Sequence, residues 1–152
     1  MKNYFLLILL AFFATACDHG LAPVEEEGEI HANITYQGEW PDEDEFHDLR
    51  FVAMRFVPES TRDFLRLEEM EVSEGLDTHV DQQSVVLEDV RNGMFFFSGV
   101  AWQFSPNIFR DWRVLGLYED NGNEFTVLGN VVEIDILVDF DDLPDFPPDD
   151  PL

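Results

Sequence analysis

The chain has 152 residues, of which 45% are hydrophobic and 15 are phenylalanine, enough for one domain with a substantial apolar core. Its 33 aspartate and glutamate residues outnumber 8 lysine and arginine residues, which gives a formal net charge of −25 at pH 7. A surface this acidic is repelled by nucleic-acid phosphates and by anionic lipid head groups, so neither is expected as a partner.

The first 17 residues, MKNYFLLILLAFFATAC, combine a positive start with a short apolar run. Lys2 precedes the run from Tyr4 to Phe13, and small residues then lead into Cys17, the only cysteine. The run is shorter than the roughly 20 residues that span a bilayer, which is typical of a signal peptide. It resembles a bacterial lipoprotein signal, in which small residues precede a cysteine that becomes lipidated. The resemblance implies a signal peptide at residues 1–16 and a lipid on Cys17; an ordinary secretory signal is the alternative.

Residues 17–28 have no periodicity and contain three consecutive glutamates, which predicts a disordered acidic tether. Asp18 follows the lipid site directly. In enteric bacteria an aspartate there retains a lipoprotein in the inner membrane, whereas other bacteria use early acidic residues for export to the surface. We expect a lipid-anchored protein of the cell envelope, with the outer membrane or cell surface favoured over the inner membrane.

Apolar and polar residues alternate from Glu29 onwards. Ile30, Ala32, Ile34 and Tyr36 share one face, which predicts a half-buried strand.

The next segment, 49–56, is apolar on both faces and ends at Pro58, which indicates a central strand. Residues 59–82 leave two alternatives open. One is a short helix capped by Ser60 and Asp63, and the other is an irregular acidic loop.

Two further strands are predicted at 84–87 and 94–104, separated by a turn at 91–93. The second carries three consecutive phenylalanines, so both of its faces need cover. Ser98-Gly99 in its middle indicates a bulge or the close approach of another backbone.

Residues 114–118 and 125–128 are predicted to form a hairpin, because Asn121-Gly122 is a strong signal for a two-residue turn. The last strand shows the clearest alternation. Its apolar face consists of Ile134, Ile136, Val138 and Phe140, and Leu137 is an exception among the polar residues between them.

About seven short strands without a long helix predict an all-β domain at residues 29–142, a single antiparallel β-sandwich. Residues 143–152, rich in proline and aspartate, predict a disordered tail. The layout is a strand, a Trp-Pro loop, a Phe-rich strand after Gly93, a Val-Leu-Gly-Leu-Tyr strand and a terminal alternating strand. It resembles the transthyretin-like (prealbumin-like) or carboxypeptidase-regulatory-like sandwiches of bacterial surface lipoproteins. An immunoglobulin-like sandwich is the alternative.

The sequence gives no sign of an enzyme. Cys17 is assigned to the anchor, no serine lies in a G-x-S-x-G turn, and the four histidines lack metal-ligand spacing. We therefore expect a non-enzymatic binding or structural module without a cofactor. A carbohydrate- or calcium-binding surface lipoprotein is the alternative.

One basic and aromatic spot stands out in the acidic chain and is the predicted partner-binding site: Phe109, Arg110, Trp112 and Arg113. Trp40 is a further aromatic candidate, and it could equally cover the edge of the sandwich. Another envelope protein or a glycan is the expected partner. No metal site is expected, and the calcium candidates are the carboxylates Asp42, Asp44, Asp139, Asp141 and Asp142. The acids are spread evenly and Lys2 is the only lysine, a pattern that favours adaptation to salt over one cation site.

Overall fold

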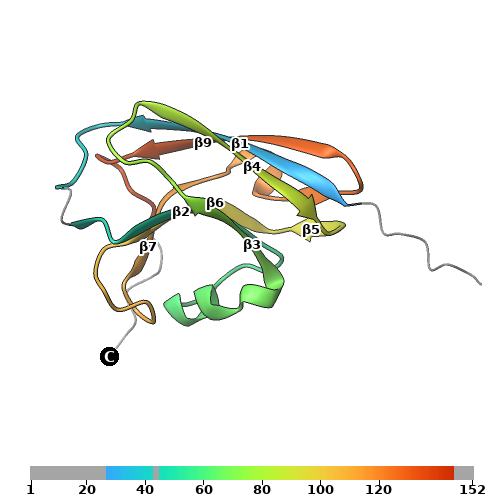
Figure 1. Ribbon diagram of the computed structural model, residues 1–152, viewed down its shortest axis with the longest axis horizontal. Coiled ribbons are helices and arrows are strands. Elements are labelled where there is room, and N and C mark those ends of the chain that lie inside the picture. Colours follow the sequence, from blue (N-terminus) through green and yellow to red (C-terminus); the bar gives the residue numbers. More distant parts are fainter. Residues whose placement is uncertain (1–26, 43–44, 146–152) are drawn as a thin grey trace, which may run out of the picture.

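Two β-sheets pack face to face in the computed structural model, which describes residues 27–42 and 45–145 (Figure 1). The upper sheet has the strand order β4-β1-β9, the lower sheet has the order β3-β2-β6-β7, and β5 pairs with β8. The all-β sandwich is thus confirmed, with nine strands in the described residues in place of about seven. Their bounds are β1 (Gly28–Gln37), β2 (Asp48–Met54), β3 (Met70–Gly75), β4 (Gln82–Val90), β5 (Gly93–Phe95), β6 (Phe97–Gln103), β7 (Trp112–Leu117), β8 (Phe125–Val127) and β9 (Val131–Asp139).

The first and last strands lie side by side and run parallel. β1 pairs with β9 from Glu29–Val131 to Gln37–Asp139, whereas the other paired strands of the described chain are antiparallel. A parallel pair needs a long connection between its strands, and here nearly the whole domain is that connection. The two ends of the domain are therefore held in one sheet.

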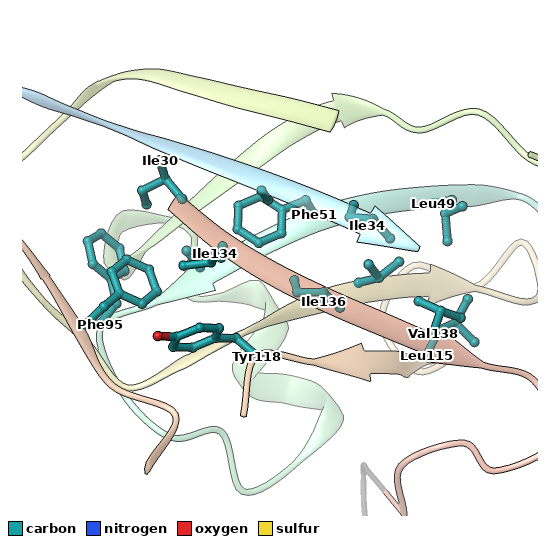
Figure 2. Packing of buried hydrophobic residues seen from close by; sticks show 14 of the residues in the cluster. Ile30, Ile34, Leu49, Phe51, Phe95, Leu115, Tyr118, Ile134, Ile136 and Val138 are labelled. Atoms are coloured by element: carbon teal, nitrogen blue, oxygen red, sulfur yellow. The ribbon is translucent and has the colours of Figure 1, made fainter. Parts of the chain in front are cut away.

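Alternation places the main core between the two sheets, as predicted for β1 and β9 (Figure 2). Ile30, Ile34, Ile134 and Ile136 are buried against the inner face of the lower sheet. Leu137, the exception in the pattern of β9, is 52% exposed on the outer face. The predicted central position of the second strand is also correct, because β2 lies between β3 and β6.

Of the two alternatives left open for residues 59–82, the short helix after Ser60 is present in 3₁₀ form, and a strand that was not predicted follows it. The helices are η2 (Thr61–Leu65) and η3 (Leu67–Glu69), and β3 follows them directly. The Asp63 carboxylate accepts hydrogen bonds from the backbone N–H groups of Glu59 (2.9 Å) and Ser60 (3.0 Å), which lower the pKa of Asp63. Within the described residues, no helix is long and apolar enough to cross a membrane.

The predicted hairpin at Asn121-Gly122 is wrong. Asn121 and Gly122 have positive φ, as their turn signal requires, but they lie in η4 (Asp120–Gly122), and β8 pairs with β5. The ring of Phe125 stacks on that of Phe95 with 5.1 Å between centroids, which holds β8 beside β5. The turn residues specified the local backbone, and packing of the aromatic rings specified the strand partner.

The predicted strand 94–104 is broken at Phe96, whose backbone N–H bonds to the carbonyl of Met54. In an unbroken strand Phe95 and Phe97 would share a face. The break sends Phe95 into the main core and Phe97 into a separate cluster on the outer face of the lower sheet.

The predicted close approach at Ser98-Gly99 is present. A Cβ atom on Gly99 would clash with the carbonyl oxygen of Gly116, and one on Gly116 would clash with that of Leu137. The β6–β7 pairing is also irregular between Val100 and Ala101. The backbones of β6, β7 and β9 are therefore in contact along one side of the sandwich.

We predict that Gly116→Ala lowers the free energy of unfolding by about 1–3 kcal/mol, because the added methyl group forces β9 away from β7. The matched control is Gly75→Ala, since a Cβ there meets only Asp48 Oδ1 at 3.9 Å. Urea unfolding of both variants measures the difference. Equal stability of the two variants would show that β7 and β9 are not in close contact.

Candidate functional site: an apolar groove on the lower sheet

The lower sheet is apolar on its outer face as well as on its inner face. Outward side chains of all four strands form a second cluster with Phe64 of η2; its buried members are Val52, Met54, Phe64, Met70, Phe97, Ala101 and Val114. The η2–η3 segment, green in Figure 1, lies below this face of the sheet. It covers the cluster in part.

A groove of about 470 Å³ remains between the η2–η3 segment and the sheet. Its lining residues come from four strands and both 3₁₀ helices: Asp48, Arg50, Val52, Phe64, Leu67, Met70, Val72, Ala101 and Trp112. Asp48, Arg50 and Val52 alternate along β2, so the lining changes from charged to apolar along that strand. The size and the mainly apolar lining are those of ordinary ligand pockets.

A guanidinium and a carboxylate form the polar part of the groove. Arg50 Nε donates to Asp48 Oδ2 at 2.6 Å, and Arg50 Nη1 donates to the carbonyl oxygen of Ser73 at 2.9 Å. Arginine has five N–H donors, and no partner of Nη2 is found in the described part of the chain. Both side chains are partly exposed, so this pair adds little to stability and is available to a ligand.

Trp112 joins the groove to the β6–β7 loop, residues 104–111. Its ring lies nearly parallel to that of Phe64, with centroids 6.5 Å apart, and its Nε1–H donates to the carbonyl oxygen of Ile108 at 2.9 Å. The loop, orange in Figure 1, lies on the same side of the lower sheet as η2–η3. Ile108 and Phe109 are 51% and 59% exposed. Trp112 therefore connects the groove to an exposed apolar loop.

The η2–η3 segment is also apolar at its surface. Leu65 of η2 is 44% exposed, and Leu67 of η3, which lines the groove, is 66% exposed. Large exposed apolar side chains thus lie on the two segments that meet the groove, η2–η3 through Leu67 and the β6–β7 loop through Trp112. We call the groove with Leu65, Leu67, Ile108 and Phe109 the outer apolar surface.

The structure places the predicted partner residues as follows. Trp112 lines the groove, Phe109 and Arg110 are exposed in the adjoining loop, and Arg113 is exposed on β7. Trp40 lies elsewhere: it packs on the main core, with its ring centroid 4.6 Å from those of Tyr36 and Phe140.

Most of the groove was missed by sequence reasoning. Arg50, Phe64 and Leu67 come from segments that are separate in the chain, and the fold brings them beside Trp112. One signal was present: the 49–56 segment is apolar on both faces, which requires a cover on its second face.

Other polar groups of the described chain take part in packing. Gln83 Nε2 donates to the Tyr36 hydroxyl at 2.7 Å, and burial raises the pKa of that hydroxyl to about 12. His79 stacks on Trp40 with 5.3 Å between ring centroids, and His31 bonds to Glu29 at 2.7 Å.

The calcium candidates that the structure describes do not form a metal site. Asp42, Asp141 and Asp142 are exposed, and Asp44 lies outside the described residues, as does Cys17. Asp139 is already used, since its carboxylate accepts hydrogen bonds from Gln37 Nε2 (2.6 Å) and from the backbone N–H of Asp141 (3.0 Å). Over residues 27–42 and 45–145, no three histidine, cysteine, aspartate or glutamate side chains form a group that could hold a metal ion.

Comparisons with known proteins identify no relative of the chain. No protein-family model, no curated protein and no solved structure matches the chain. What the outer apolar surface binds is therefore inferred from its lining and charge.

We predict that the melting temperature rises gradually with NaCl and has no saturating response to CaCl₂. In the described chain, arginines pair with only four carboxylates, those of Asp48, Asp63, Glu69 and Glu71. The remaining acids repel one another, and this repulsion is screened at about 1 M salt, where the Debye length is about 3 Å. Calcium would bind at a single site only if several oxygen ligands converged there. The melting temperature would then rise with calcium concentration and show a midpoint.

The measurement is the melting temperature in NaCl, and in CaCl₂ and MgCl₂ at matched ionic strength. A calcium-specific midpoint would indicate a metal site, and a melting temperature that is flat in every salt would rule out charge repulsion as a destabilising force.

Proposed function

We propose that this protein is a lipid-anchored lipoprotein of the bacterial cell envelope that acts as a non-enzymatic binding module. The residue pattern from Met1 to Cys17 supports the anchor. The outer apolar surface is the observation that supports binding. The outer membrane or the cell surface is the favoured location, and the even spread of acids accords with a salty environment.

Several features of the outer apolar surface favour binding over a purely structural role. Exposed leucine, isoleucine and phenylalanine lie on the two segments that meet the groove, and apolar surface gathered in this way is typical of interaction sites. Tryptophan, arginine, phenylalanine and methionine, all present in its lining, are enriched in protein interfaces. A partner that covered them would gain roughly 25 cal/mol for each Å² of apolar surface removed from water.

The polar groups of the groove suit recognition better than catalysis. The guanidinium of Arg50 has hydrogen-bond donors and no acceptor, so it suits recognition of a ligand oxygen atom. Its bond to Asp48 leaves donors on Nη2 that can hold an oxygen atom of a ligand. This supports a module that binds without reaction.

A carbohydrate is the second candidate ligand, because Trp112 lines the groove and sugar rings stack on aromatic faces. The remaining apolar lining is mostly aliphatic, from Val52, Leu67, Met70 and Val72, which favours side chains of a protein.

We predict that Cys17→Ser moves the protein from the membrane fraction to the soluble fraction. Stable anchoring requires two or more acyl chains, and these are lost with the cysteine thiol. Fractionation of cells that express each form, followed by a high-salt wash, measures the change. If the variant stays in the washed membranes, the lipid on Cys17 is not the anchor.

We also predict that a photo-reactive phenylalanine analogue at Leu67 of the full chain forms a discrete cross-linked adduct in living cells. Leu137, which is exposed to a similar degree on the upper sheet, is the matched control position. The outer apolar surface contacts a partner, whereas Leu137 faces solvent, so only the first position should cross-link. Equal adducts from both positions, or none from Leu67, would contradict a binding role for this surface.

A further inference from the structure

We infer that the outer apolar surface binds a basic polypeptide segment, whose apolar side chains enter the groove while its lysines or arginines meet carboxylates on the η2–η3 side. This inference rests on the proposed binding function and names the class of partner. It follows from the extent of the surface, the acidic charge of the η2–η3 side and the charge of the whole chain.

The extent of the surface favours a polypeptide. The groove is lined by Val52 and Ala101 of the sheet, by Leu67 of the η2–η3 segment and by the Trp112 ring. Exposed apolar side chains continue beyond the groove to Phe109. A small molecule would fill the groove alone, whereas a chain segment can cover the groove and its borders together.

Charge on the η2–η3 side favours a basic partner. Residues 59–74 contain six acids and two arginines. Arg66 bonds to Glu69 at 2.7 Å, and Arg55 pairs with Glu71 at 3.3 Å. The exposed carboxylates of Glu59, Glu68 and Glu74 have no cationic partner in the described part of the chain. They are therefore available to cations of a ligand.

The polar part of the groove suits a peptide backbone. Nη2 of Arg50 can donate to a peptide carbonyl oxygen, and the Asp48 carboxylate can accept from a peptide N–H. A backbone that offers both groups would satisfy both sides of this ion pair, which a purely apolar ligand would leave partly desolvated.

The charge of the whole chain disfavours the other occupants of this surface. A second copy would bring a net charge of −25 against −25, so self-association through the apolar surface is opposed. Anionic membranes and acidic proteins are repelled for the same reason. A basic partner is instead attracted, and its rate of association should fall as salt rises.

The test measures binding of three labelled 12-residue peptides to the full chain in phosphatidylcholine nanodiscs, by fluorescence anisotropy with empty discs as the blank. One peptide alternates leucine and lysine, the second has glutamate for lysine, and the third has serine for leucine. The protein variants are Leu67→Arg and its matched control Leu137→Arg, which adds the same charge to the other sheet.

We expect the leucine–lysine peptide to bind the native protein and Leu137→Arg within twofold of each other, and Leu67→Arg at least tenfold more weakly. The other two peptides should bind at least tenfold more weakly to the native protein. A second pair separates charge from packing: Glu68→Lys should weaken binding severalfold, and Glu133→Lys on the upper sheet should not. Circular dichroism confirms that each variant is folded.

The inference is overturned if the glutamate peptide binds as well as the lysine peptide, or if Leu67→Arg and Leu137→Arg bind alike. Its failure is distinguishable from failure of the proposed function. A partner cross-linked at Leu67 in cells, together with no preference for the lysine peptide, would leave the binding module intact and remove its basic partner.

Discussion

The lower sheet must be covered on both of its faces, and much of the rest of the structure depends on this constraint. Its strands carry apolar side chains on either side, so the upper sheet covers one face and the η2–η3 segment covers the other. The first cover is complete, because alternation in β1 and β9 continues over the length of both strands. The second is provided by two short 3₁₀ helices, and the groove remains between them and the sheet.

The chain has few arginines, and some of them contact more than one segment of the fold. Arg55 shows this best: it pairs with Glu71, donates to the carbonyl oxygen of Arg91 at 2.7 Å and lies 4.4 Å over the Phe95 ring, so one side chain joins three segments. Arg66 similarly stacks on Phe56 and bonds to Glu69. Arg110 and Arg113, next to the groove, form no ion pair within the described residues. Arg55 and Arg66 thus hold separate segments of the fold together.

Periodicity predicted the strands that it governs and failed where contacts between distant segments decide the structure. β1 and β9 followed from alternation because each has one buried face. Asn121-Gly122 has the positive φ that its turn signal requires, but the partner of β8 is set by Phe125 stacking on Phe95, a contact that no local pattern contains. The candidate site divides in the same way: Trp112 was identified by its charged neighbours, whereas Phe64 and Leu67 become part of the groove only once η2–η3 folds over the sheet.

The net charge and the outer apolar surface are best understood together. An exposed apolar groove of this kind would normally promote self-association, because two copies could bury it against each other. In dilute salt, where charges are weakly screened, a net charge of −25 on every copy opposes that contact at long range, while the apolar attraction acts only on contact. The same charge attracts a basic partner, so it selects among the proteins that could cover Leu67 and Trp112. Repulsion among the acids lowers the stability of the isolated domain. The same charge keeps the domain soluble and makes its binding surface selective for basic partners.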